Sequence, residues 1–451
     1  MPIKAHEKTI LVLLSLYLVA TWTSIAGMEI FGWATFIAAI TYAFRVPKIS
    51  PSTFSCIGEF LPWKTMIAIV LITIIGIFKN GHEGADELYS IGSQRWVFLL
   101  LSTSIALTLW PPTLKGYRFF LIVTGVIAVY GVFQSFTGID LLRPGENRAV
   151  QGLDVKGPMK LWRTAGLFGS PMHYIYVVGQ HACLPLAVAF LFPKEQNSLR
   201  KWSLFVFALI FASLMTTYVR GGWIAMACAY LVMAYFVSRK AFAYVIGSGA
   251  VAGAALFAAL PAVRERVMQL FDMGYTSNSD RLLLWKANWI MFTEYPVWGV
   301  GYSENETLSG KYLTAMGFPN AFTGHAHNTY LQWLAGAGLT GFLAYMLFIT
   351  FFLWLTVRLY RRLPVEAYWP RALTLASLGA QVHVHIGGFT ECNFKAGVTN
   401  HNFMVTLAIV ASLSALEAKG LIGKNARLAL PKPEPRDVHS QALGTAPGNA
   451  V

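Results

Sequence analysis

The chain has 451 residues, of which 55% are apolar and only 12% are charged. A soluble domain carries about 25% charged residues, so this chain has roughly half the charge needed to cover a water-exposed surface. The aromatic content of 14% excludes disordered and fibrous classes. The four cysteines lack CxxC spacing, which excludes an obvious disulfide framework or zinc site. This composition is typical of a polytopic membrane protein.

Apolar runs long enough to cross about 30 Å of hydrocarbon recur along the chain. The stretch 203–237 is too long for one span, and a charge beside two glycines favours a surface turn at Arg220-Gly221-Gly222. In the similarly long run 328–357, Gly336-Ala337-Gly338 is expected to bend the first part along the interface. The pattern predicts an all-α fold of about twelve transmembrane helices, at about 9–25, 28–44, 64–78, 95–110, 117–136, 172–193, 202–218, 222–237, 241–260, 328–357, 369–388 and 401–417.

These spans predict four parts of the chain. Residues 1–260 form an N-terminal transmembrane bundle of about nine helices, with an outer loop at 137–171. Residues 261–327 form a long outer loop that contains short interfacial helices, and residues 328–418 form the C-terminal transmembrane helices. The Pro-, Gly- and Ala-rich segment 419–451 is expected to be a disordered cytoplasmic tail.

The distribution of Lys and Arg predicts the orientation of the spans. With the N-terminus inside, the inner segments hold 21 of the 35 basic residues and 7 of the 21 acidic ones, so the whole net charge of +14 lies on one side. This asymmetry is a topology signal and argues against a nucleic-acid partner. Both termini are therefore predicted to be cytoplasmic, with the loops 137–171 and 261–327 outside.

Arg220 stands inside an apolar stretch, directly before two glycines. Such an arginine costs about 2.5–3.5 kcal/mol on insertion scales unless it snorkels or finds a partner. One interpretation is a side chain that snorkels at a helix end. The other is an anion site, because a guanidinium binds phosphate bidentately and glycines expose backbone N–H groups.

A second arginine, Arg281, lies in the long outer loop within Asn278–Trp289. Polar and aromatic side chains recur here at helical spacing and predict one face of a short interfacial helix. They are Arg281, Trp285, Asn288 and Trp289. On this segment alone, Arg281 is better explained as a solvated residue of an amphipathic helix at the membrane surface.

The third segment carries a family resemblance. His327-Asn328, nine residues and then Gly338-Leu339-Thr340-Gly341 resemble the H-[NSQ]-x9-G-x-x-G signature of the bacterial O-antigen ligase family. Arg220 before its glycine pair and Arg281 in R-x3-W match two arginines of that family. The stretch from Arg163 to Pro171 is similar to its R-x-x-G-x-x-x-x-P motif. The resemblance covers about residues 120–415, and it depends on the order and outward placement of the motifs together.

The resemblance implies a GT-C-like glycosyltransferase of the bacterial inner membrane with a periplasmic active site. It implies three partners: an undecaprenyl diphosphate-linked glycan as donor, a hydroxyl of lipid A-core as acceptor, and membrane lipids. Arg220 and Arg281 would bind the diphosphate and His327 would accept the acceptor's proton, without a cofactor or a metal.

The resemblance also points to four possible supporting residues. Arg163 adds a positive charge to the first outer loop, and His325 is an alternative base. Asn328 either orients His327 or caps the helix that follows. Glu391, in the last outer loop, either orients His327 or an arginine or is simply solvated.

Some histidines suggest a metal site instead, together with one cysteine: His325, His327, His383, His385, Cys392 and His401. This interpretation is disfavoured because residues i and i+2 of a helix do not share a face and no acidic cluster accompanies them.

Other functions remain open. Within the family these are a repeat-unit polymerase and a protein O-oligosaccharyltransferase. The ligase is preferred because the H-x9-GxxG pattern suits it and no large extra C-terminal domain is present. A transporter or flippase is disfavoured because the sequence shows no inverted repeat and no series of ionisable residues within the spans.

Overall fold

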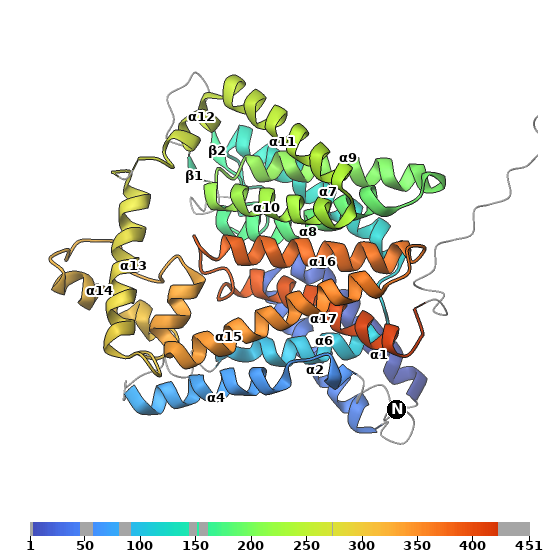
Figure 1. Ribbon diagram of the computed structural model, residues 1–451, viewed down its shortest axis with the longest axis horizontal. Coiled ribbons are helices and arrows are strands. Elements are labelled where there is room, and N and C mark those ends of the chain that lie inside the picture. Colours follow the sequence, from blue (N-terminus) through green and yellow to red (C-terminus); the bar gives the residue numbers. More distant parts are fainter. Residues whose placement is uncertain are drawn as a thin grey trace, which may run out of the picture.

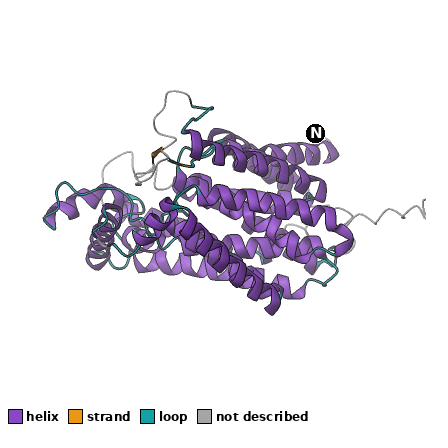
Figure 2. Cartoon of the chain, turned by 90° about the horizontal axis from the view of Figure 1, so that it is seen from above, coloured by secondary structure: helices purple, strands orange, loops and turns teal. Residues whose placement is uncertain are grey.

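The computed structural model describes residues 3–45, 57–80, 92–143, 151–152, 161–272 and 274–422. Over these ranges the chain is almost entirely helical, as Figures 1 and 2 show. The helices that form the bundle are α1 (Ile3–Thr23), α2 (Ile25–Arg45), α4 (Trp63–Asn80), α6 (Trp96–Leu109), α7 (Leu114–Thr137), α8 (Pro171–Leu191), α9 (Asn197–Met215), α10 (Arg220–Val237), α11 (Arg239–Ala259), α15 (Thr329–Arg362), α16 (Tyr368–Gly387) and α17 (Gly397–Ala418).

The remaining elements lie outside the bundle helices, and apart from α13 they are short. They are η1 (Ser93–Arg95), η2 (Lys194–Gln196), α12 (Pro261–Met268), α13 (Thr276–Glu294), α14 (Glu304–Ala315), β1 (Gln151–Gly152) and β2 (Trp162–Arg163). The two strands pair antiparallel, with Gln151 opposite Arg163. In Figure 1, α13 runs steeply across the end of the bundle, as expected of an interfacial helix in the segment 261–327.

The predicted all-α polytopic fold is confirmed, because each of the twelve predicted apolar runs lies on a separate helix. Among the described residues, eight helices are long and apolar enough to cross a membrane by length and composition. These are α2, α7, α8, α9 with the turn before it, α10, α11, α15 and α17. That α1, α4, α6 and α16 also cross the membrane stays a prediction, since they are shorter or more polar.

The two predicted transmembrane parts form one bundle. Helix α16 packs against α8 and α10, and α17 packs against α6 and α8, so the C-terminal helices lie in the middle of the N-terminal ones. The break between α9 and α10 falls at residues 216–219, which confirms the division predicted at Arg220. The segment 419–451 is predicted to be a disordered tail. Residues 423–451 of this segment lie outside the described residues, so its disorder stays a prediction.

Helix α15 is bent at Gly338, whose φ of +64° and ψ of −168° are accessible essentially to glycine alone. The N–H of Leu339 donates to the carbonyl of Pro296 at 2.8 Å, so the segment 296–301 lies directly against the bend. A Cβ on Gly338 would lie 2.4 Å from the carbonyl of Val297. The first glycine of the G-x-x-G pattern is therefore required by its dihedral angles and by this close approach.

Gly338→Ala is expected to destabilise the folded protein by about 1–3 kcal/mol, because a side chain at this φ and ψ is strained and meets the Val297 carbonyl. The measurement is the thermal unfolding midpoint of the purified protein in detergent. Gly247→Ala on α11 is the matched control, since a Cβ there meets no atom within 4 Å. Equal midpoints for the two variants would contradict the requirement for glycine.

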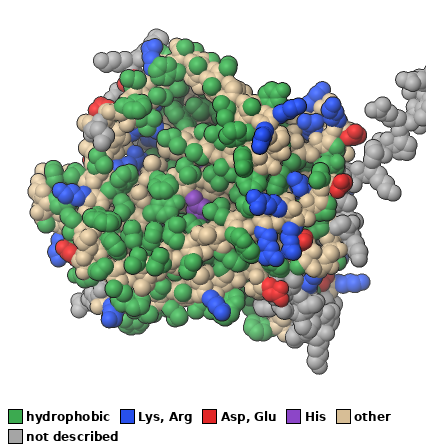
Figure 3. Space-filling model, in the orientation of Figure 1, with side chains coloured by type: hydrophobic (Ala, Val, Ile, Leu, Met, Phe, Trp, Pro, Cys, Tyr) green, Lys and Arg blue, Asp and Glu red, His purple; other side chains and the backbone are tan. Residues whose placement is uncertain are grey.

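The two ends of the bundle differ in their charge. In Figure 1 the N-terminus lies at the end opposite to α13 and α14, and in Figure 3 Lys and Arg side chains gather at that same end. The loops 138–143 and 388–396 and the segment 260–328 lie at the other end. This arrangement agrees with the predicted topology, in which the charged end is cytoplasmic.

The orientation can be tested with single cysteines in a variant whose four native cysteines are replaced. Thr314, on α14, and Glu366, between α15 and α16, are both exposed. A membrane-impermeant maleimide added to intact spheroplasts is expected to label Thr314→Cys and to spare Glu366→Cys. Labelling of both after detergent treatment is the control, and the reverse pattern in intact spheroplasts would invert the topology.

Candidate functional site

Four arginines from four separate elements line one cavity of about 350 Å³. We call it the arginine cavity. Arg163 ends β2, Arg220 begins α10, Arg266 belongs to α12 and Arg281 to α13. The structure thus brings together Arg163, Arg220 and Arg281, which the sequence singled out separately, and adds Arg266.

Arg220 is fixed in the wall of this cavity. Its Nη1 donates to the carbonyl of Gln269 at 2.6 Å, and its Nη2 donates to Asn278 Oδ1 at 2.9 Å. The ring of Tyr275 lies 5.1 Å from the guanidinium carbon. With 8% of its surface exposed, Arg220 is held between α10 and the outer segment and does not snorkel outward.

Several N–H donors of the cavity wall have no hydrogen-bond acceptor among the described residues. They are Arg266 Nε, Arg281 Nε and Trp285 Nε1, all of them buried. Buried donors are nearly always paired in folded proteins. Three unpaired donors around one cavity therefore indicate a ligand that supplies acceptor oxygens.

The electrostatics of the cavity favour an anion as well. Burial, together with the positive charges of Arg266, Arg281 and Arg220, lowers the pKa of Arg163 to about 10. Arg220, Arg266 and Arg281 form no ion pair with any carboxylate in the described part of the chain. The charges of these three arginines are thus not compensated by a carboxylate among the described residues, and an anion would compensate them.

The helix predicted around Arg281 is α13. The side chains of its predicted polar face do not all lie in the same environment. Arg281 and Trp285 line the cavity. Asn288 is buried and accepts a hydrogen bond from Asn305 at 2.7 Å, whereas Trp289 is 51% exposed. The polar face therefore contributes one helical turn to the site and packs against α14 in the next.

A histidine pair lines a second cavity, of about 410 Å³. We call it the histidine cavity and define it by His325, His327 and Glu391. His327 Nδ1 lies 3.1 Å from Glu391 Oε2, and His325 Nε2 lies 3.6 Å from Glu391 Oε1. The two imidazole rings are 4.0 Å apart. One carboxylate thus contacts both imidazoles.

The backbone at His327 is strained, with a φ of +47° that a non-glycine residue rarely adopts. Its N–H donates to His325 Nδ1 at 3.1 Å, which closes the turn. Asn328 follows as the N-cap of α15, and its Oδ1 accepts from the N–H groups of Tyr330 and Leu331. Asn328 therefore caps the helix. The start of the helix fixes the position at which the preceding turn, His325–His327, ends.

Glu391 is buried, with 7% of its surface exposed, so the solvated interpretation is wrong. Burial alone would raise the pKa of its carboxyl group. The hydrogen bond and charge of His327, with further contributions from His325 and the N–H of Cys392, hold that pKa below its usual value instead. Glu391 is therefore a carboxylate that accepts a hydrogen bond from His327.

His325 has a different electrostatic environment. Burial lowers the pKa of its imidazole and outweighs the opposing effect of Glu391. His325 is consequently neutral near pH 7, and its Nδ1 is already engaged by the N–H of His327.

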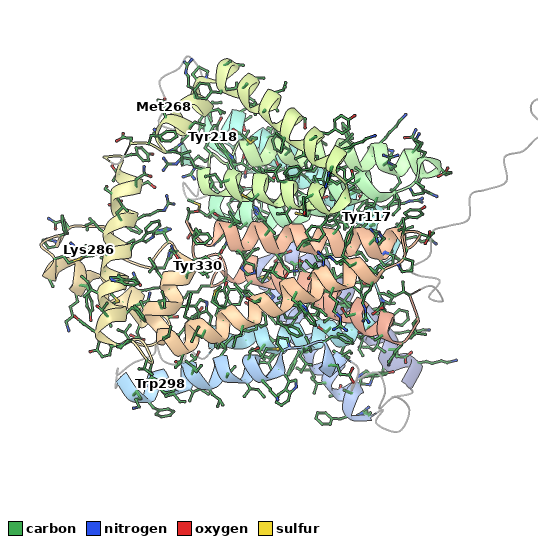
Figure 4. The ribbon with its side chains drawn as sticks, in the orientation of Figure 1. Tyr117, Tyr218, Met268, Lys286, Trp298 and Tyr330 are labelled. Carbon is green, nitrogen blue, oxygen red and sulfur yellow. The ribbon has the colours of Figure 1, made fainter. Side chains whose placement is uncertain are left out.

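The two cavities have a common wall. Met172 and Tyr176 of α8 line both of them. The neighbouring residues Thr390 and Glu391 line the arginine cavity and the histidine cavity respectively. Figure 4 labels Tyr218, which lines the arginine cavity, and Tyr330, at the start of α15, both towards the α13 end of the bundle. An anion site and a histidine–carboxylate pair are thus adjacent.

Residues 205–346 match a family model described as O-antigen ligase. Over this segment, the chain is similar to the O-antigen ligase family. The matched segment holds Arg220, Arg266, Arg281 and His327, while Arg163 and Glu391 lie outside it. No curated protein matches the chain. Similarity to this family indicates a membrane-associated glycosyltransferase of the O-antigen ligase or polymerase type.

Some polar residues that line the two cavities were missed by sequence reasoning. Arg266 lies in a charged stretch, Arg264–Arg266, where nothing in the pattern distinguishes it from its neighbours. Lys395 and Glu306 line the histidine cavity and form an ion pair at 2.5 Å, although 89 residues separate them. His173, on α8, lines the same cavity. Their contributions depend on tertiary contacts, which local spacing does not encode.

The sequence argument against a metal fails in part. His325 and His327 lie in a turn, not on a helix, and Glu391 joins them. One ligand atom from each of these three residues lies within 4.8 Å of the others. Their geometry would permit a metal ion. Independence of the reaction from a metal therefore stays a prediction. The other candidates, His383, His385, Cys392 and His401, do not belong to this group.

Proposed function

We propose that the protein transfers an O-antigen glycan from undecaprenyl diphosphate to a sugar hydroxyl of lipid A-core, at the periplasmic face of the bacterial inner membrane. One observation carries the proposal: a cavity lined by four arginines shares a wall with a histidine–carboxylate pair. Such a transfer needs a cationic site for the leaving diphosphate and a base for the acceptor, side by side.

In the donor complex, Arg220 and Arg281 bind the diphosphate, supported by Arg163 and Arg266. The unpaired donors Arg281 Nε and Trp285 Nε1 supply further hydrogen bonds to its oxygens. Charge develops on the diphosphate as the bond between its oxygen and the anomeric carbon breaks. Preorganised cations stabilise that charge more in the transition state than in the ground state.

In the acceptor complex, His327 is the general base. Because its Nδ1 donates to Glu391, Nε2 is left to accept the proton of the acceptor hydroxyl. The hydroxyl oxygen then bonds to the anomeric carbon, and the undecaprenyl diphosphate leaves. Glu391 positions the imidazole and stabilises the imidazolium that forms.

The reaction proposed here needs no metal or other cofactor. The leaving group is already a diphosphate, and four guanidinium groups supply the charge that a divalent cation would otherwise provide. The base requires no metal activation either, since a neutral imidazole accepts a proton near pH 7.

A deletion strain tests the proposed substrates, with lipopolysaccharide separated on a gel. Loss of a ligase is expected to leave bare core, and undecaprenyl-linked glycan should accumulate on the outer face of the membrane. Core that carries a single repeat unit would indicate a polymerase. Normal lipopolysaccharide with altered glycoprotein would indicate a protein O-oligosaccharyltransferase, and glycan stranded on the cytoplasmic face would indicate a flippase.

A further inference from the structure

A basic cleft of about 510 Å³ lies at the bundle end opposite to the two cavities described above. The junction of α10 with α11, the end of α15 and the start of α16 form its walls. We define it by Arg239, Arg361 and Arg371, with Tyr235 and Tyr360 between them. Figure 3 shows Lys and Arg side chains gathered at this end of the molecule.

No carboxylate among the described residues neutralises the positive charge of the basic cleft. Arg371 is fixed, because its guanidinium stacks 4.4 Å above the ring of Tyr360 and donates to the carbonyl of Leu363 at 2.9 Å. The exposed side chains of Arg239 and Arg361 form no ion pair with any described residue. The neighbouring Arg362, by contrast, pairs with Glu417 at 3.6 Å.

Two further features favour an anion in this cleft. Helix α11 begins at Arg239 and Ser238 is its N-cap, so the positive end of the helix dipole faces the cleft. The hydroxyl of Tyr360 is buried in the wall, where the guanidinium of Arg371 contacts its oxygen, and its O–H can still donate to a ligand. A phosphate group would offer acceptor oxygens to the arginines and to this hydroxyl.

The surroundings of the cleft favour a lipid over a soluble phosphate. No residue of α11 is buried, and apolar side chains such as Val251, 71% exposed, face outward along it. Tyr235, 68% exposed, stands at the rim, where aromatic residues occupy the membrane interface. A headgroup in the cleft would thus lie directly above a helix surface suited to its acyl chains.

We propose that the basic cleft binds the phosphate of an anionic phospholipid headgroup, such as that of phosphatidylglycerol, in the cytoplasmic leaflet. Basic pockets between transmembrane helices on this side of a membrane are suited to such headgroups. The proposal is independent of glycan transfer, because none of the cleft residues belongs to the arginine or histidine cavity.

The test measures phosphatidylglycerol binding to the full-length purified protein in detergent by native mass spectrometry. The double variant Arg239→Ala/Arg361→Ala is expected to bind about tenfold more weakly or worse. Lys115→Ala/Arg118→Ala is the matched control, because it removes two exposed cations at the start of α7 outside the cleft. It should bind like the parent protein, as should Arg239→Lys/Arg361→Lys, which keeps the charge.

Phosphatidylcholine with the same acyl chains and inorganic phosphate distinguish the possible ligands. Preference for phosphatidylglycerol over both, lost in the alanine variant but kept in the lysine variant, would support the proposal. Equal binding of phosphatidylcholine, or full competition by millimolar phosphate, would overturn it. So would unchanged phosphatidylglycerol binding in the alanine variant, or an equal loss in the control pair. The unfolding midpoint without lipid verifies that each variant is folded.

Discussion

Replacement of His327 by alanine is expected to lower glycan transfer by about 10²- to 10⁴-fold, the usual contribution of a general base. The acceptor is an alcohol, which is a poor nucleophile near neutral pH. His327 alone combines a contact with the Glu391 carboxylate and a ring nitrogen left to face the acceptor. Binding of the undecaprenyl diphosphate-linked donor should survive, because the arginine cavity supplies it. The measurement compares donor binding with transfer by the purified variant.

His325→Ala is the matched control for His327→Ala. It removes the neighbouring imidazole of the same cavity and leaves the hydrogen bond between His327 and Glu391 in place. Parental transfer by His327→Ala together with loss in His325→Ala would show that His325 is the base. The same assay with EDTA tests metal independence. Loss of transfer that returns with an added divalent cation would assign His325, His327 and Glu391 to a metal instead.

Arg281→Lys is expected to reduce transfer by roughly 10- to 100-fold, which corresponds to one lost hydrogen bond to a charged group. Lysine keeps the positive charge but loses the planar fork and the unpaired Nε that faces the arginine cavity. Arg220→Lys should have at least as large an effect, because it also loses the hydrogen bonds to Gln269 and Asn278. The measurement is transfer as a function of donor concentration, at matched protein levels.

Arg264→Lys provides the control for the arginine variants. Arg264 is exposed, belongs to α12 like Arg266, and does not line the arginine cavity. Its lysine variant should transfer glycan at the parental rate. Full activity of both Arg281→Lys and Arg220→Lys would count against bidentate binding of the diphosphate.

Features encoded by neighbouring residues were predictable from the sequence. The twelve apolar runs, the break before Arg220, the cap at Asn328 and the bend at Gly338 all depend on local patterns, and the structure has each of them. The proximity of Arg220 and Arg281 was suggested by the family resemblance, whereas that of Arg163 was not. Their catalytic roles, like that of His327, stay predictions.

Features that depend on tertiary contact were not predictable. The participation of Arg266 and the pair formed by Lys395 and Glu306 require segments that meet only in the folded chain. The metal argument failed because it placed His325 and His327 on a helix. The positive φ of His327 belongs instead to a turn. The residues around the two histidines did not predict that backbone conformation.

The bend at Gly338 separates the part of α15 that has to match the bilayer from the part that supports the histidine cavity. Residues 339–362 rise about 36 Å as a helix, slightly more than the roughly 30 Å of hydrocarbon in a typical bilayer. A helix of this length adapts to changes in bilayer thickness by tilting. Residues 329–337 instead stay hydrogen-bonded to the segment 296–301 and to Gly388. Leu339 and Thr340 are bonded to the same segment, so we expect changes in thickness to alter the tilt of residues 341–362 more than the distance between His327 and Glu391.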